Sequence, residues 1–203
     1  MPTHIISTTE QLDALYGEVG AASRIKETNT IHPHYRAMIA ASPFAVLATS
    51  GPDGLDASPR GDPAGFVVVE DETTLLLPER RGNNRVDSLR NLLSDPRMAL
   101  LFLIPGLGET LRVNGRATIS VAPDLLDRFV MQGKPPNCVL VIKVESVFFQ
   151  CARAIQRSGL WLPAHERPRL PTPGQILEAL TESAIDGRQY DAELPARQRA
   201  TLY

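Results

Sequence analysis

The sequence predicts a mainly β fold with peripheral helices, arranged as an antiparallel barrel of about six or seven strands. Seventeen prolines and fourteen glycines are spread along the 203 residues, which is typical of many short elements and not of a helical bundle. The apolar segments are joined mostly by turn signals, without the strand–helix alternation of a doubly wound sheet. We expect one domain over residues 1–203, with helices at about 8–41 and a helical, proline-rich tail at about 163–203.

Composition narrows the class of protein further. Hydrophobic residues make up 43%, charged residues 22%, and the net charge is −2, which is unlike the strongly basic domains that bind nucleic acid. The longest apolar run, Met98 to Ile104, is far shorter than the about 20 residues of a membrane-spanning helix. The first residues lack the basic and apolar segments of a signal peptide. Cys138 and Cys151 are too few for a disulfide framework or a four-thiolate metal site. We expect a cytoplasmic protein with no nucleic-acid or membrane partner and no metal.

The N-terminal part predicts two helices and then two hairpins. Residues 8–17 place apolar side chains at helical spacing behind Thr8, and a second helix follows Pro33 and ends before Pro43. Apolar runs separated by turn residues then predict strand pairs at 44–49 with 55–59 and at 65–69 with 74–77.

The remaining helices and strands are predicted from the pattern of apolar and polar residues. An amphipathic pattern predicts a helix over 84–94, and unbroken apolarity predicts a buried strand over 98–104. Residues 111–121 alternate apolar and polar side chains throughout, which predicts an antiparallel strand with one wet or liganded face. A helix at 123–132, a long strand at 138–149 and a helix near 173–182 complete the prediction.

The stretch from Glu79 to Ser88 is the most informative for function, because it leaves a strand, turns at a glycine and enters a helix. Free N–H groups and the positive dipole end at a helix start favour anions. Arg85 and Ser88 lie three residues apart, so in a helix they share one face. The stretch also offers the guanidinium, amide and hydroxyl groups of a phosphate site, with either asparagine able to cap the helix: Arg80, Arg81, Asn83, Asn84, Arg85 and Ser88. A capped helix with solvated arginines explains the pattern equally well.

A second polar group stands at the end of a predicted strand, in the run from Ser58 to Pro63. Rigid, polar strand ends often line the mouth of a barrel, although by itself this run is a turn. Elsewhere, Trp161 follows Arg157 and a glycine turn, so it either packs in the core or covers a flat ring.

Four features follow one another in a distinctive order. A buried strand precedes a hairpin that ends in Ser-Pro-Arg-Gly-Asp (58–62), and an arginine-rich turn opens a helix that ends in Asp-Pro-Arg (95–97). Met98–Phe102 and the alternating strand with Gly-Arg-Ala (115–117) come next. Over roughly residues 32–161 this series resembles the pyridoxamine 5'-phosphate oxidase-like, FMN-binding split-barrel family, close to its branch of oxidase-related FMN-binding proteins.

The resemblance implies a split β-barrel homodimer with two FMN molecules at the dimer interface. Arg60 and its neighbours would line the flavin, and residues 80–88 would hold its phosphate. Thr110 would face the polar edge of the ring, while Arg157 and Trp161 would approach from the C-terminal side, in the same or the partner subunit. The implied cofactor-binding residues are Ser58, Arg60, Gly61, Arg80, Arg81, Asn83, Asn84, Arg85, Ser88, Thr110, Arg157 and Trp161.

The resemblance further implies an FMN-dependent oxidoreductase that acts on a small molecule at the exposed flavin face. The vitamin-phosphate oxidase itself has a lysine on the strand that corresponds to residues 65–69, and a tyrosine, an arginine and a serine on a helix that corresponds to 124–131. Here the strand has no lysine and the helix has one arginine and two carboxylates, so the implication does not extend to vitamin-phosphate oxidation. The alternatives are a non-catalytic flavin-binding or sensing protein and a split barrel that uses a deazaflavin or haem.

Overall fold

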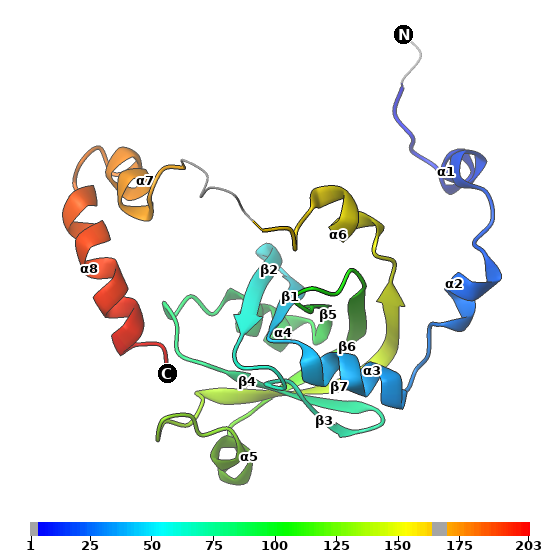
Figure 1. The fold of residues 1–203 in the computed structure, drawn as a ribbon, viewed down its shortest axis with the longest axis horizontal. Coiled ribbons are helices and arrows are strands. Elements are labelled where there is room, and N and C mark those ends of the chain that lie inside the picture. The colour runs from blue at the N-terminus through cyan, green and yellow to red at the C-terminus, as the bar shows by residue number, and fades with distance from the viewer. Residues whose placement is uncertain (1–3, 164–169) are drawn as a thin grey trace.

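The computed structural model describes residues 4–163 and 170–203 and contains a seven-stranded antiparallel sheet (Figure 1). The order of strands across the sheet is β2-β1-β5-β6-β7-β4-β3. The prediction of a mainly β, antiparallel fold with six or seven strands is therefore confirmed. The strands are β1 (Phe44–Gly51), β2 (Gly54–Gly61), β3 (Val68–Asp71), β4 (Thr74–Glu79), β5 (Arg97–Leu103), β6 (Thr110–Ser120) and β7 (Cys138–Gln150).

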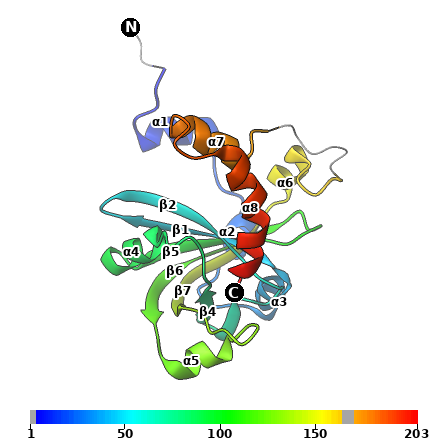
Figure 2. The ribbon, with the colours of Figure 1, turned by 90° about the vertical axis from the view of Figure 1, so that its left-hand side faces the viewer.

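Alternation along the strands places the core on the inner face of the curved sheet (Figure 2). In β6, Leu111, Val113 and Ala117 are buried while Arg112 and Arg116 are exposed, as the periodicity predicts. The inner side chains of the other strands complete the core, among them the fully buried Leu47, Leu75, Leu77, Leu100, Phe102, Leu140, Ile142 and Val147. Helix α3 (Pro33–Ala41), which buries Ile39, and helix α4 (Asp87–Ser94), which buries Leu92, pack against this sheet.

The sheet curves until β2 and β4 approach each other, although the two strands do not form a ladder. In the strand order β2 is an edge strand, and β4 lies five strands away from it. Yet Arg60 on β2 and Glu79 on β4 form an ion pair with 2.6 Å between Nε and Oε1. Side chains, and not backbone hydrogen bonds, therefore close the barrel at this place, which we call the seam.

Several element boundaries differ from the sequence prediction. The strand expected at 65–69 begins only at Val68, because Gly65 adopts a φ of +86° that breaks the extended backbone. The helix expected at 123–132 is α5 (Pro123–Arg128), and the helix expected at 84–94 begins at Asp87. The helices α1 (Thr9–Tyr16) and α7 (Pro173–Leu180) lie close to their expected positions.

Helix α6 (Arg153–Ser158) was not predicted, and α2 (Ala21–Ile25) and α8 (Gly187–Ala200) lie in segments expected to be helical but had no predicted range of their own. The first two are short, and α8 contains Pro195, which disfavours a helix interior. In α8 the side chain of Asp186 caps the first turn by accepting a hydrogen bond from the Gln189 N–H at 2.9 Å. The tail is thus more helical than its proline content suggests, and its residues 164–169 fall outside the described part of the chain.

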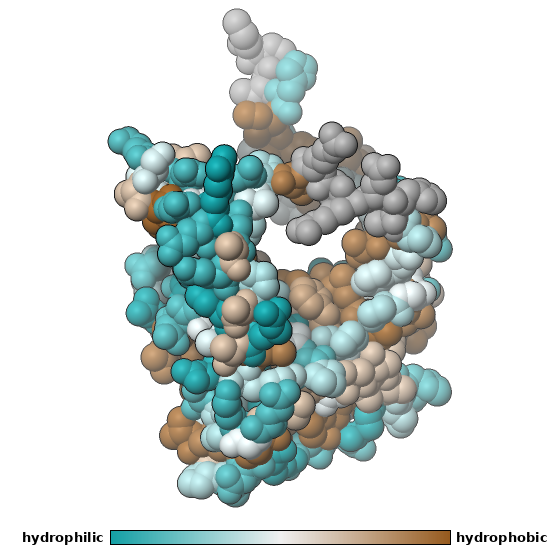
Figure 3. All heavy atoms as spheres, turned by 60° about the vertical axis from the view of Figure 1, so that its left-hand side comes forward, coloured by the Kyte–Doolittle hydropathy of each residue, from teal (hydrophilic) through white to brown (hydrophobic). Residues whose placement is uncertain are grey.

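Helices α1 and α2 and helices α7 and α8 lie outside the barrel on opposite sides, and the C-terminus returns beside the barrel (Figure 1). At one end lie α1 and α2, in which no residue is buried, and at the other end α7 and α8 pack against each other. Figure 3 shows a face of the molecule that is hollowed, with apolar side chains on its floor and hydrophilic side chains on one wall. Within residues 4–163 and 170–203, the helices are all too short or too polar to cross a membrane.

Gly115 offers a test of the sheet. It faces a bulge in β7, where the pairing passes from Ser146 to Val144, and a Cβ at this position would lie 2.3 Å from the carbonyl oxygen of Lys143. We expect Gly115→Ala to lower the free energy of unfolding by about 1–3 kcal/mol, because two backbones must move apart. Urea denaturation of the purified protein measures this difference.

Gly82→Ala is the matched control, because a Cβ there meets no atom within 4 Å. We expect this variant to be as stable as the original chain or slightly more stable, through lower entropy of the unfolded state. Equal stability of the two variants would contradict the close strand contact at Gly115.

Candidate functional site

A cavity of about 620 Å³ opens at the seam. Its walls are β2, the end of β4, the loop over residues 80–86 and the first turn of α4. The structure brings together here nine of the twelve residues that the sequence pointed to: Ser58, Arg60, Gly61, Arg80, Arg81, Asn83, Asn84, Arg85 and Ser88.

Arg60 is fixed at the centre of the cavity wall by three hydrogen bonds. Its Nε donates to Glu79, its Nη1 donates to the Pro59 carbonyl at 3.0 Å, and its Nη2 donates to the Ser88 hydroxyl at 3.1 Å. The Arg60 and Glu79 side chains are only 16% and 12% exposed. Burial raises the pKa of Glu79 above its usual range, and the neighbouring Arg60 charge opposes that rise. The three hydrogen bonds therefore hold the guanidinium in one position, with the Glu79 carboxyl beside it.

Asp56 connects the same wall to α4. Its carboxylate accepts hydrogen bonds from the Ser58 hydroxyl at 2.9 and 3.0 Å and from the Ser88 hydroxyl. Ser88 is 3% exposed, so its hydroxyl is engaged on both sides, as a donor to Asp56 and as an acceptor from Arg60. Asp56, Ser58 and Arg60 share a face of β2 because side chains alternate along a strand.

A second ion pair crosses the seam beside the first one. Arg80 Nε lies 2.8 Å from Asp62 Oδ2, and the Arg80 Nη1 also donates to the Phe129 carbonyl. The Asp62 side chain is only 3% exposed and that of Arg80 is 16% exposed. Both seam arginines therefore carry a buried carboxylate partner.

The loop that follows β4 is open to solvent. Arg81, Asn83, Asn84 and Arg85 are exposed, and Asn84 adopts the left-handed conformation with a φ of +59°. Within residues 4–163 and 170–203, the main-chain N–H groups of residues 81–84 donate no hydrogen bond. Unpaired N–H groups in such a turn form a concavity that favours anions.

Two expectations for this loop are wrong. The residue that caps α4 is Val86, without a side-chain hydrogen bond, so neither Asn83 nor Asn84 caps the helix. Asn83 instead accepts a hydrogen bond from the Arg85 N–H at 3.0 Å. Arg85 precedes the helix and does not share a helical face with Ser88, because the left-handed turn at Asn84 delays the first helical residue. Its side chain is 78% exposed and pairs with Asp87 at 2.6 Å.

The three other predicted residues lie outside the cavity of their own chain. Thr110 is half-buried and donates to Gln150 at 3.3 Å, and Arg157 is exposed on α6. The Trp161 indole N–H donates to the Leu107 carbonyl at 2.7 Å. The arrangement within one chain therefore does not bring these side chains to the seam.

Sequence reasoning missed the acidic half of the site, namely Asp56, Asp62 and Glu79. A signal was present, because the alternation that places Ser58 and Arg60 on one face of a strand includes Asp56. Glu79 terminates an otherwise apolar run, which favours a partnered charge at the end of a buried strand. Neither pattern identifies the partner, because β2 and β4 meet only in the folded barrel.

Comparison with known proteins identifies the family of this chain. The family described as Pyridoxamine 5'-phosphate oxidase matches residues 31–151, which is more than half of the chain and spans β1 to β7. The chain belongs to this family. The resemblance drawn from the order of motifs is therefore confirmed, and the seven-stranded antiparallel sheet with its open seam is the split barrel that it implied.

No curated protein sequence matches this chain. Several solved structures are similar to it in fold. HupZ from Group A Streptococcus is 19% identical, with a TM-score of 0.48 over 60% of this chain and 94% of its own. A putative pyridoxamine 5'-phosphate oxidase from Lactobacillus delbrueckii is 22% identical, with a TM-score of 0.47 over 60% of this chain and 95% of its own. A protein from Clostridium acetobutylicum related to general stress protein 26 is 13% identical, with a TM-score of 0.45 over 58% and 86%.

The ion pair between Arg60 and Glu79 makes stability depend on pH in a defined direction. Arg60→Met leaves Glu79 buried without its partner, and we expect a loss of about 3–5 kcal/mol at about pH 7. A carboxyl group with a raised pKa binds more protons in the folded state, so its contribution to stability decreases as pH rises through that pKa. The loss should therefore be smaller at about pH 5, where Glu79 can take up a proton. Urea denaturation at the two pH values measures both losses.

The double variant Arg60→Met/Glu79→Gln is the control, because it has no buried charge at this point. Its loss of stability should therefore not become smaller at about pH 5, because no carboxyl is left at this position to take up a proton. An Arg60→Met variant whose loss also does not become smaller at about pH 5 would contradict the ion pair across the seam.

Proposed function

We propose that this chain is an FMN-binding flavoprotein whose seam cavity holds the phosphate end of the cofactor. The observation that carries the proposal is the loop over residues 80–86, where exposed guanidinium groups and unpaired main-chain N–H groups border a cavity in a member of this family. Flavin binding is typical of the family, and phosphate recognition is the chemistry that such a loop provides.

The residues present fit this cofactor. A volume of about 620 Å³ lies within the range of about 300–1,000 Å³ that is usual for cofactor sites. Four arginines line the cavity against three carboxylates, so positive charge is in excess. Asp56 and Glu79 already accept hydrogen bonds from serine hydroxyls and from Arg60, whereas Arg81 is exposed in the loop. A phosphate that enters the cavity therefore meets hydrogen-bond donors at the loop, while the carboxylates of Asp56 and Glu79 are already hydrogen-bonded to other side chains.

In this proposal the protein binds and orients, and FMN, when bound, supplies hydride or electron transfer. Arg81, Arg85 and the N–H groups of the loop hold the phosphate. Arg60, immobilised by Glu79 and Ser88, presents a fixed positive charge to the bound cofactor. The activity we propose is that of an oxidoreductase for a small molecule at the exposed flavin face. A non-catalytic flavin sensor uses the same contacts but does not turn over, and a deazaflavin or haem protein of this fold lacks bound FMN.

The absorption spectrum of the freshly purified protein, with mass spectrometry of the molecule released by heat, tests the proposal. We expect a flavin spectrum and the mass of FMN. The double variant Arg81→Ala/Arg85→Ala should bind FMN at least about tenfold more weakly, because each charge-assisted hydrogen bond contributes about 1.5–3 kcal/mol. Fluorescence titration with FMN and with riboflavin, which lacks the phosphate, measures the difference.

Arg97→Ala is the matched control, because Arg97 pairs with Asp95 outside the seam cavity and should leave FMN affinity unchanged. A colourless protein that takes up no added FMN would overturn the proposed function. A double variant that retains full affinity would overturn the role of the loop.

We further propose that the active form is a homodimer with the flavin at its interface. Two observations support this. Thr110, Arg157 and Trp161 lie outside the cavity of their own chain, so the flavin contacts that the resemblance implies for them would require a second copy. The outer face of β1 and β5 is also apolar, with Val46 opposite Leu101 and a 37% exposed Phe44 opposite Leu103.

Leu101→Asp tests the dimer. Leu101 is half-buried on the outer face and lies opposite Arg112 in the strand register, so an aspartate there is compatible with the fold but not with an apolar interface. We expect the protein to sediment as a dimer and this variant as a monomer in analytical ultracentrifugation. Val121→Asp changes an exposed apolar residue beyond β6 and should remain dimeric. A monomeric parent protein would overturn the proposal.

A further inference from the structure

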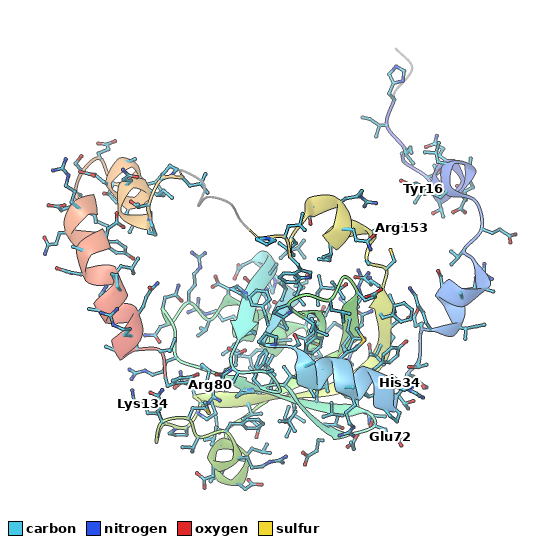
Figure 4. All side chains as sticks on the ribbon, in the orientation of Figure 1. Tyr16, His34, Glu72, Arg80, Lys134 and Arg153 are labelled. Carbon is cyan, nitrogen blue, oxygen red and sulfur yellow. The ribbon has the colours of Figure 1, made fainter. Side chains whose placement is uncertain are left out.

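The segment that follows α8 returns to the barrel and contacts Asp62 and Lys134 beside the seam cavity. The Tyr203 hydroxyl donates a hydrogen bond to Asp62 Oδ1 at 2.7 Å, and the Tyr203 carbonyl accepts one from Lys134 Nζ at 2.7 Å. Figure 4 shows Arg80 and Lys134 on the side of the barrel that the end of α8 approaches. Tyr203 lies outside residues 31–151, so this contact is made by a part of the chain that the family comparison does not cover.

Tyr203 and Asp62 both contact the Arg80 side chain. The Arg80 Nε donates to Asp62 Oδ2, its Nη1 donates to the Phe129 carbonyl, and its guanidinium carbon lies 5.7 Å from the centre of the Tyr203 ring. In the part of the chain that the structure describes, the Arg80 Nη2 donates no hydrogen bond. Arg80 also lines the cavity. Its guanidinium is thus oriented on three sides and retains N–H donors for a ligand.

We infer that Tyr203 is a positioning residue for the cofactor site: by donating to Asp62, it leaves the Arg80 Nη2 available to the phosphate of FMN. This inference rests on the proposed function. Asp62 is almost fully buried, and each of its two oxygens has one donor, Tyr203 for Oδ1 and Arg80 for Oδ2. A buried carboxylate oxygen that loses its hydrogen-bond donor is costly unless another N–H or O–H group replaces that donor. The nearest source is a second N–H of Arg80, since a guanidinium can bind a carboxylate at two points.

The protonation state of Tyr203 agrees with this role. The hydrogen bond to Asp62 raises the pKa of the Tyr203 phenol above its usual range. The phenol therefore remains protonated and continues to donate throughout the neutral range. The ring adds a favourable contact with the Arg80 cation that does not depend on the hydroxyl.

Tyr203→Phe separates the hydroxyl from the ring. The variant retains the ring over Arg80 and removes only the donor to Asp62, and circular dichroism would confirm that it is folded. We expect the dissociation constant for FMN to rise about tenfold, because Arg80 withdraws one charge-assisted hydrogen bond from the phosphate. The dissociation constant for riboflavin, which has no phosphate, should change less than about twofold. Fluorescence titration of the full-length protein measures both.

Tyr190→Phe is the matched control, because Tyr190 lies on α8 with its ring 4.3 Å from the Arg197 guanidinium and does not line the cavity. Both dissociation constants should stay unchanged in it. A Tyr203→Phe variant that weakens FMN and riboflavin equally, or neither of them, overturns the role of Tyr203 while the proposed function stands. A parent protein that binds no FMN overturns the proposed function and this inference together.

Discussion

Two buried ion pairs across the seam between β2 and β4 hold the open side of this barrel together. Arg60 pairs with Glu79 at 2.6 Å and Arg80 pairs with Asp62 at 2.8 Å, so each side of the seam contributes one cation and one anion. A ladder of backbone hydrogen bonds would bring the strands to about 4.8 Å and leave no space between them. Side-chain bridges are longer, and the cavity occupies the space that they leave. The same two ion pairs therefore explain why the barrel is split between β2 and β4 and why the cavity lies there.

Because the bridging groups are buried charges, the residues that stabilise the seam differ from those that would bind a ligand in the proposed function. A buried charge that loses its partner is costly, so Arg60, Glu79 and Asp62 are constrained by stability before any ligand is considered. The loop over residues 81–85 is not constrained in this way, because its side chains are exposed. In the proposed function, substitutions in that loop change the affinity for the cofactor with little effect on stability. Substitutions in the ion pairs act mainly on the fold.

Most strands could be predicted because four of the six pairings in this sheet join strands that follow each other in the sequence. Alternation over residues 111–121 and the turn at 51–54 predict β6 and the first hairpin directly, and both are present. The approach of β2 to β4 is different, because it depends on the curvature of the whole sheet and involves no turn signal. Nine predicted site residues gather in one cavity, yet their carboxylate partners were missed for that reason. The hydrogen bond from Tyr203 to Asp62 could not be predicted either, since 141 residues separate the two.

Ser88 shows how the structure changes the meaning of a residue that the sequence singled out. Its hydroxyl has one proton, which it donates to Asp56, and it accepts from Arg60. A phosphate oxygen needs a donor, so Ser88 could bind phosphate only by turning away from Asp56. That carboxylate would then keep only the Ser58 hydroxyl, next to an anion. The arrangement favours a structural link between α4 and the seam for Ser88. In the proposed function, phosphate recognition then falls to Arg80 and to the N–H groups and arginines of the exposed loop.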